Sequence, residues 1–107
     1  MSPYITNPKR EGLDKILDKL QREINSRKKR INEKTAVNMG GSETDIDGEI
    51  NYIITRIIDR TYSAEQRYAS FNRAIGVLEC VKQEYLRRVV ALYENKKCEE
   101  SGDVYGQ

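Results

Sequence analysis

The sequence predicts an all-α protein, a small bundle of three main helices with a long C-terminal helix, completed by oligomerisation. Apolar residues recur at spacings of three and four along three stretches of the 107-residue chain. Strict alternation of apolar and polar residues, which would indicate a strand, is absent. The mean hydropathy is -0.78 and 34% of the residues are charged, so one copy has little apolar material for a core of its own.

The first predicted helix starts with Asn7 as the N-cap and Pro8 at the first helical position, where the missing N–H of proline is not needed. The helix then fades at the polar stretch 26–30, and two interpretations stay open: a polar extension of the helix, or a polar insertion or loop at 27–47. Residues 35–48 lack periodicity and favour a flexible loop. The apolar stripe of this helix consists of Leu13, Ile16, Leu17, Leu20 and Ile24.

The second predicted helix opens at Asp47 or Gly48. Its isoleucines follow three-and-four spacing with polar residues between them, which favours a helix over a strand. Ser63 and Gln66 have the spacing of a capping box, which predicts a further short helical turn. The apolar face of this helix consists of Ile50, Ile53, Ile54, Ile57 and Ile58.

The third predicted helix begins near Ser70 and is the longest. From Phe71 to Lys96 it would span about 39 Å at ~1.5 Å per residue, which is too long for a compact monomer of this size. We therefore expect part of it to contact another subunit. Gly76 interrupts the helix, to allow close approach of another helix or of a ligand. The tail 99–107 has no periodicity and is expected to be disordered or a strap over a neighbouring subunit.

Composition excludes several classes of function. The chain has no histidine, which excludes Ser/His and Cys/His catalytic pairs and every histidine-containing metal site. We expect a single domain over 1–107, no cofactor and no enzymatic activity. The apolar runs are too short for a membrane span or signal peptide, so a cytoplasmic protein is expected, in the host cytoplasm if phage-encoded. Cys80 is predicted to be a small buried residue, and Cys98 a free surface thiol.

Magnesium-dependent hydrolysis and nucleic-acid binding are both disfavoured by the pattern of charges. Glu11, Asp14 and Asp18 form one carboxylate run, but no second set faces it, as a magnesium site on paired helices would need. The basic run 27–30 is more typical of a solvated helix end than of a phosphate-binding patch. The net charge of +2 averages over alternating basic and acidic blocks, whereas a nucleic-acid footprint normally shows one dominant positive field.

Tyrosine next to arginine is the more informative pattern. Arg56 follows Tyr52 by one helical turn, and Arg87 and Arg88 come directly after Tyr85. A nucleotide site needs at least a flat ring that stacks on the base and a guanidinium group that binds the phosphate. Tyrosine also suits half-buried helix edges and subunit interfaces, so this structural role stays an alternative.

Five separated blocks of sequence occur in a recognisable order, and together they resemble a widespread family of small, mostly uncharacterised helical proteins of phages and bacteria. The chain departs from the family pattern at 27–47, which looks like an insertion, and at Ala91-Leu92, where the family commonly carries Ala-Pro. Because the basic run 27–30 lies in this insertion, it is not expected to carry the function of the family. The five blocks are Pro3 to Ile5, Gly48 to Thr55, Ile75 to Cys80, Tyr85 to Val90 with Tyr93-Glu94, and Gly102 to Tyr105.

The family is similar in size and helical make-up to viral sponge proteins that defeat CBASS immunity, an antiphage defence, by binding its cyclic-oligonucleotide signal without cleaving it. The resemblance implies a homo-oligomer, a tetramer rather than a dimer, with a cyclic dinucleotide bound between subunits. The short apolar runs predict no membrane partner, and nucleic-acid binding is kept as the least favoured alternative. The alternative is an adaptor or regulatory protein that binds a host or phage protein through its third helix. The candidate ligand residues are Tyr4 and Tyr105 as terminal lids, Tyr52 for stacking, Asn51 and Thr55 for base or ribose, and Arg56, Arg87 and Arg88 for phosphates.

Overall fold

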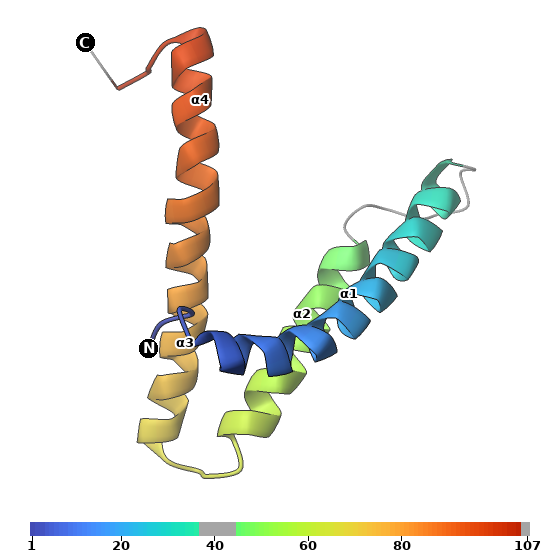
Figure 1. Ribbon diagram of the computed structural model, residues 1–107, viewed down its shortest axis with the longest axis vertical. Coiled ribbons are helices and arrows are strands. Elements are labelled where there is room, and N and C mark those ends of the chain that lie inside the picture. Colours follow the sequence, from blue (N-terminus) through green and yellow to red (C-terminus); the bar gives the residue numbers. More distant parts are fainter. Residues whose placement is uncertain (37–44, 106–107) are drawn as a thin grey trace. The chain divides into compact units, whose positions relative to one another are not determined.

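The computed structural model describes residues 1–36 and 45–105, and this part of the chain is helical without strands. The elements are α1 (Asn7–Ala36), α2 (Asp45–Tyr62), α3 (Tyr68–Tyr85), the π-helix η1 (Leu86–Val90) and α4 (Ala91–Ser101) (Figure 1). The predicted all-α fold with a long C-terminal helix is confirmed. The chain divides into two compact units, residues 4–64 and residues 1–3 with 65–107. The prediction of a single domain stays a prediction.

Helix α1 begins one residue earlier than predicted. The N–H of Arg10 donates to the carbonyl oxygen of Thr6 at 3.0 Å, so Thr6 holds the N-cap position and Asn7 is already helical. The helix continues to Ala36, which shows that the polar extension was the correct interpretation and that a loop over 27–36 was wrong. Residues 37–44 of the predicted insertion lie outside the described residues, and 45–47 are the first residues of α2.

Helix α2 opens at Asp45, two residues before the predicted start. Asp45 and Asp47 lie in its first turn, where negative charge is favourable because the unpaired N–H groups of a helix start carry partial positive charge. The predicted turn of helix between Ser63 and Gln66 is wrong, because residues 63–67 form a turn and an extended stretch. Arg67, not Ser63, is the N-cap residue of the helix that follows, and no side chain caps that helix.

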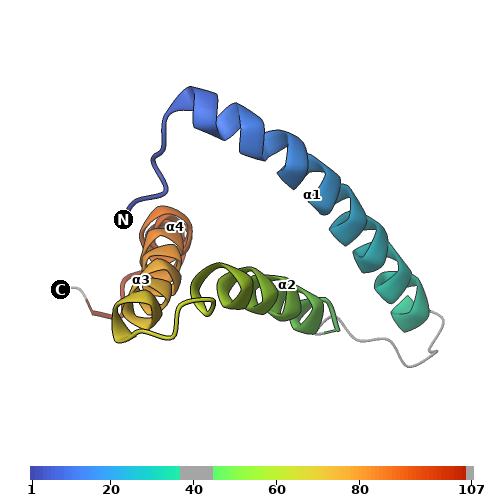
Figure 2. The ribbon, with the colours of Figure 1, turned by 90° about the horizontal axis from the view of Figure 1, so that it is seen from below.

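Within the unit 4–64, α1 and α2 meet where the middle of α1 passes the start of α2. Leu20, Ile24 and Arg27 of α1 line the same groove as Gly48 and Ile53 of α2. The two helices diverge toward the start of α1 (Figure 2). Apolar side chains beyond the meeting point therefore stay exposed, which is how Leu13, Ile16, Leu17, Ile54 and Ile57 are found.

In the other unit, α3, η1 and α4 follow one another as a continuous rod (Figure 1). They contribute 18, 5 and 11 residues, or about 50 Å at ~1.5 Å per residue. The rod ends at Gly102, whose φ of 88° suits glycine and whose N–H donates to the carbonyl oxygen of Cys98 at 2.8 Å. Residues 99–101 are thus helical rather than tail, contrary to the prediction, and only 102–105 of the described residues follow the helix.

The side of the rod that carries Gly76 is covered by the first residue of the chain. A Cβ on Gly76 would lie 2.7 Å from Cε of Met1, so the glycine makes room for a methionine side chain rather than for another helix. The thiol of Cys80, one turn further, donates to the carbonyl oxygen of Met1 at 3.5 Å. Cys80 is half-buried and Cys98 is exposed, which confirms the exposed position of the second thiol and corrects the full burial predicted for the first.

Buried side chains are scarce. Among the described residues, Ala74 is the buried apolar residue and Ser70 the buried polar one. No helix in the described ranges is both long enough and apolar enough to cross a membrane. The expectation of a small core per copy is therefore confirmed for the described residues, and long apolar faces remain open to water.

Candidate functional site

A groove of about 370 Å³ lies between α1 and α2 in the unit 4–64. Its wall on α1 is formed by residues one turn apart, and its wall on α2 by the first two turns of that helix. The lining surface is mostly apolar, and it is formed by three aliphatic side chains, one tyrosine, one glycine and three charged residues. The residues are Leu20, Glu23, Ile24 and Arg27 from α1, and Gly48, Glu49, Tyr52 and Ile53 from α2.

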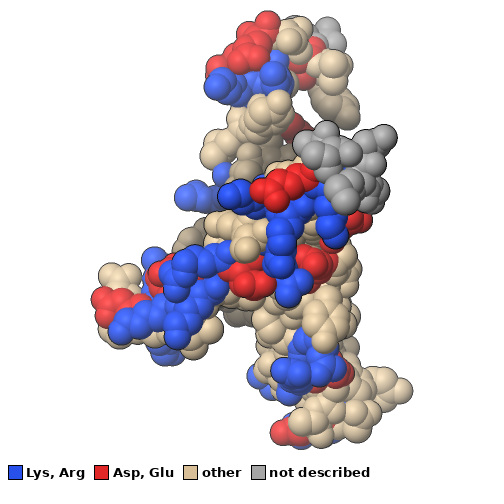
Figure 3. Space-filling view, turned by 90° about the vertical axis from the view of Figure 1, so that its right-hand side faces the viewer, with Lys and Arg blue, Asp and Glu red and all other residues tan. Residues whose placement is uncertain are grey.

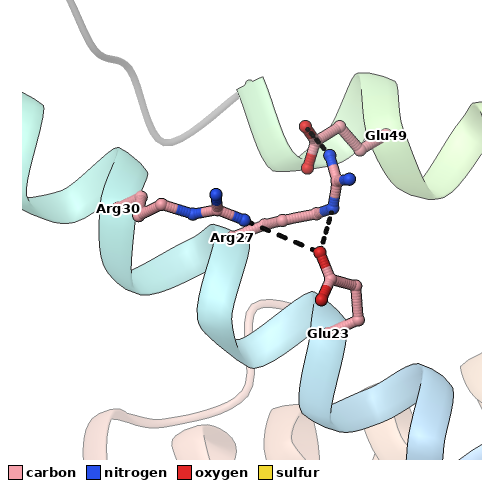
Figure 4. A network of polar contacts seen from close by, with 4 residues as sticks. All are labelled: Glu23, Arg27, Arg30 and Glu49. Atoms are coloured by element: carbon pink, nitrogen blue, oxygen red, sulfur yellow. Dashed lines mark hydrogen bonds and ion pairs between the residues drawn. The ribbon is translucent and has the colours of Figure 1, made fainter.

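Arg27 connects the two walls of this groove (Figure 4). Its Nη1 donates to Oε1 of Glu49 on α2 at 3.1 Å, and its Nε donates to Oε1 of Glu23 on its own helix at 3.0 Å. Arg30 lies beside the same Glu23 oxygen, with Nη2 at 3.6 Å. The basic run that the sequence shows is thus partly neutralised by acids, as a solvated helix face would be.

The electrostatics of this network hold Arg27 in its charged form. The carboxylate of Glu49, and after it that of Glu23, raises the pKa of Arg27 above its ordinary value. A raised pKa means that the pairing stabilises the fold at every pH below the ordinary arginine pKa and is lost only as pH rises through the higher folded value. Salt concentration, rather than pH, is therefore the useful variable for testing this contact.

We expect replacement of Arg27 by alanine to lower the free energy of unfolding by a small amount at low salt, because exposed ion pairs contribute little to stability. The difference should shrink in about 1 M salt, where the screening length falls to roughly 3 Å. Urea unfolding followed by circular dichroism measures both values. Arg22→Ala, also on exposed α1 surface, is the matched control. Equal losses for the two variants would contradict a specific role for Arg27.

Tyr52 and Arg56 lie one turn apart on α2, as the spacing predicted. The ring of Tyr52 borders the groove and is 65% exposed, so one of its faces is open to a stacking partner. Arg56 is half-buried, and its Nε is shielded from solvent without a hydrogen-bond partner. Because the Nε is shielded, a ligand could meet Arg56 only through the rest of its guanidinium group, whose positive charge suits an anionic group.

Asn51 and Thr55 occupy the neighbouring side of α2 and already bond to each other. The hydroxyl of Thr55 donates to Oδ1 of Asn51 at 3.0 Å. The amide nitrogen of Asn51 and the lone pairs of the Thr55 hydroxyl stay available for a ligand. Both side chains are exposed, so the predicted base- or ribose-contacting pair is preassembled by the helix itself.

The remaining predicted residues do not gather around this groove within the unit 4–64. Tyr4 belongs to that unit and is exposed, but it is not among the lining residues. Arg87 and Arg88 lie in η1, and Arg87 is held by Glu84 at 3.0 Å. Tyr105 is 93% exposed, and its backbone N–H donates to Oδ1 of Asp103 at 2.8 Å. These assignments stay predictions.

The groove itself does not suit a phosphate. Glu23 and Glu49 outnumber Arg27 among the charged lining residues, so the local charge is negative. One oxygen of Glu49, Oε2, is shielded from solvent and has no hydrogen-bond partner. An aromatic or aliphatic body with N–H donors fits this lining better than an anion, whereas the next turn of α2, with Arg56, is the place for negative charge.

Glu23 and Glu49, the two acidic residues that line the groove, were not predicted as site residues from the sequence. Glu23, Arg27 and Glu49 come together although Arg27 and Glu49 are 22 residues apart, and no fixed spacing marks such a pair. The one available signal was that Glu23 and Arg27 are four residues apart on a helix, the spacing at which opposite charges attract. Among the residues that the structure describes, no group of three or more Cys, Asp or Glu could hold a metal ion.

Figure 3 shows that blue basic and red acidic side chains lie next to one another on the same helices. Searches of curated proteins and of solved structures give no match to this chain. Residues 1–104 match a family described as a domain of unknown function, DUF6899. Because that match spans nearly the whole chain of 107 residues, the protein belongs to the DUF6899 family.

Proposed function

We propose that the protein is a non-enzymatic binding protein that sequesters a cyclic oligonucleotide signal, such as a cyclic dinucleotide, and so inhibits an antiphage defence. The observation that carries the proposal is the Tyr52–Arg56 turn of α2. It places an exposed tyrosine at the edge of an apolar groove, one turn from the positive charge of a half-buried arginine. A ring to stack on a base and a guanidinium for the phosphate are what such a ligand requires.

The charges of the site suggest how a nucleotide would be oriented. The base would stack on Tyr52 over the apolar lining, because the carboxylates of Glu23 and Glu49 repel a phosphate there. The phosphate would lie toward Arg56, and Asn51 and Thr55 would contact the ribose or a base edge. Arg87 and Arg88 remain separate candidates for a second phosphate. The protein would act in the cytoplasm, as an assembly of several copies, by lowering the concentration of free signal.

Isothermal titration calorimetry with cyclic di- and trinucleotides tests the proposal directly. We expect binding at micromolar protein, and recovery of the intact nucleotide after the complex is heated. Recovery of a cleaved product would show an enzyme instead. Absence of heat with every cyclic nucleotide, for a protein whose helicity is intact, would refute the proposal.

A second candidate function is favoured by a different observation. Val81, Tyr85, Val89 and Tyr93 are all largely exposed on the C-terminal rod, and apolar faces of this kind commonly bind proteins. An adaptor that holds a host or phage protein through this face would bind no nucleotide. Calorimetry therefore separates the two candidates, since an adaptor gives no heat with cyclic nucleotides.

A further inference from the structure

The carboxylate of Glu23 has hydrogen-bonding capacity left over on the wall of the groove between α1 and α2. Its contacts with Arg27, at 3.0 Å, and with Arg30, at 3.6 Å, both end on Oε1 (Figure 4). Oε2 has no hydrogen-bond or ion-pair partner among the residues that the structure describes. The side chain lines the groove and is 55% exposed. Because a carboxylate oxygen accepts up to two hydrogen bonds, Glu23 can accept further bonds from a ligand.

Glu49, the other carboxylate of the groove, offers less to a ligand. Its Oε1 accepts from Nη1 of Arg27 at 3.1 Å, and its Oε2 is shielded from solvent. A ligand cannot reach that shielded oxygen unless the side chain moves. Glu23 rather than Glu49 therefore presents the open carboxylate oxygen of the groove.

The rest of the groove suits a flat, uncharged ring. Its volume of about 370 Å³ lies within the range of small-molecule pockets, roughly 300 to 1,000 Å³. The lining surface is mostly apolar, and Tyr52 stands exposed at the edge. Stacking on a tyrosine accepts every base, because every base has an aromatic face. The choice among bases therefore depends on hydrogen bonds at the edge of the ring.

We infer that the groove selects guanine among the nucleotide bases, and that Glu23 recognises its Watson–Crick edge. Guanine carries two adjacent donors on that edge, N1–H and the N2 amino group, which a carboxylate accepts as a parallel pair of charge-assisted bonds. The inference rests on the proposed function, and it makes the sequestered signal a cyclic dinucleotide that contains guanine.

The other bases match a carboxylate less well. Adenine and cytosine have an acceptor ring nitrogen beside their amino group, and uracil has a carbonyl oxygen on each side of its N3–H. A carboxylate that meets one of these edges gains one hydrogen bond and brings its second oxygen against an acceptor. A site that is built to bond a donor pair therefore rejects the ligand that lacks the pair.

Calorimetric titration with cyclic di-GMP and with cyclic di-AMP tests the selection, because the two ligands have the same charge and differ in their bases. We expect the wild-type chain to bind cyclic di-GMP roughly tenfold or more tightly than cyclic di-AMP. Glu23→Gln keeps the length of the side chain but replaces one acceptor oxygen by a donor. This variant should bind the two nucleotides within a few-fold of each other.

Glu33→Gln is the matched control. Glu33 is also an exposed carboxylate on α1, and it is not among the residues that line the groove. Its replacement should leave the preference for cyclic di-GMP unchanged. A merely structural role of Glu23 would weaken both nucleotides alike, so the ratio of the two affinities is the decisive measurement.

Guanosine, which carries no phosphate, separates this inference from the proposed function. In an NMR titration of the labelled protein, guanosine should shift the backbone amide signals of Gly48 and Tyr52, and adenosine should shift them less. If guanosine does so while no cyclic dinucleotide binds, the sequestering function is wrong and the guanine site stands.

The opposite separation is equally clear. If cyclic di-AMP binds as tightly as cyclic di-GMP, or if the preference survives Glu23→Gln, the selection of guanine is wrong while the sequestering function stands. Guanosine that shifts neither amide signal would also overturn the inference.

Discussion

Replacing Tyr52 by alanine should weaken binding of a cyclic dinucleotide roughly 5- to 150-fold. Stacking of a base on an aromatic side chain contributes about 1 to 3 kcal/mol, and each ~1.4 kcal/mol corresponds to a factor of ten in affinity. The ring of Tyr52 is exposed at the rim of the groove, so its removal should affect the fold little. Calorimetric titration of wild type and variant gives the two affinities.

Two further variants make this test specific. Tyr52→Phe keeps the ring and should bind within a few-fold of the wild type, because stacking needs the aromatic face rather than the hydroxyl. Tyr68→Ala removes a tyrosine that is even more exposed, at 86%, from the other unit, and should leave the affinity unchanged. If all three variants bind as the wild type does, the stacking role of Tyr52 is wrong even where the protein binds nucleotide elsewhere.

Replacing Leu92 by proline should destabilise the protein far less than proline at an ordinary helix position. Proline inside an α-helix costs about 3 kcal/mol or more, because it loses a hydrogen bond and its ring strikes the carbonyl group four residues back. Directly before Leu92, however, the N–H of Ala91 already bonds five residues back, to Leu86. The π turn widens the backbone directly before Leu92, so we expect Leu92→Pro to cost less than the ~3 kcal/mol of proline inside a regular helix.

Lys82→Pro is the matched control, because Lys82 is exposed and lies inside the regular helix α3. It should show the full cost. Unfolding in urea, followed by circular dichroism at one protein concentration, compares the two variants without interference from association. Equal costs at the two positions would show that η1 does not open the backbone for proline.

The presence of each helix could be predicted from the sequence, because the spacing of apolar residues that indicates a helix is a local pattern. The isoleucines from Ile50 to Ile58 and the stripe from Leu13 to Ile24 repeat at the period of the helix, and both stretches are helical. The boundaries were less accurate. Thr6 rather than Asn7 caps α1, and the spacing of Ser63 and Gln66 suggested a turn of helix that does not form. Several side chains can serve an N-cap, so the cap pattern alone does not select one of them.

The candidate site also contains some contacts that could be predicted from sequence and others that could not. Arg56 was predicted to lie one turn from Tyr52, and α2 places it so. Asn51 and Thr55 were predicted only to contact a base or ribose, and on α2 they also bond to each other. The bond from Arg27 to Glu49 could not be predicted, since it depends on where α1 and α2 meet. The open groove between them likewise depends on the divergence of the two helices (Figure 2).

The sequence by itself determined that the chain is helical, that it has little core per copy and that its chemistry must do without histidine. These properties follow from composition and from periodicity over a few turns. Only the tertiary structure decided which charges neutralise the basic run, which residue covers Gly76 and where the C-terminal helix contains a π turn. Contacts between distant residues depend on how helices are placed, and a π turn depends on a balance between i→i+4 and i→i+5 hydrogen bonds. Neither leaves a repeating pattern in the sequence.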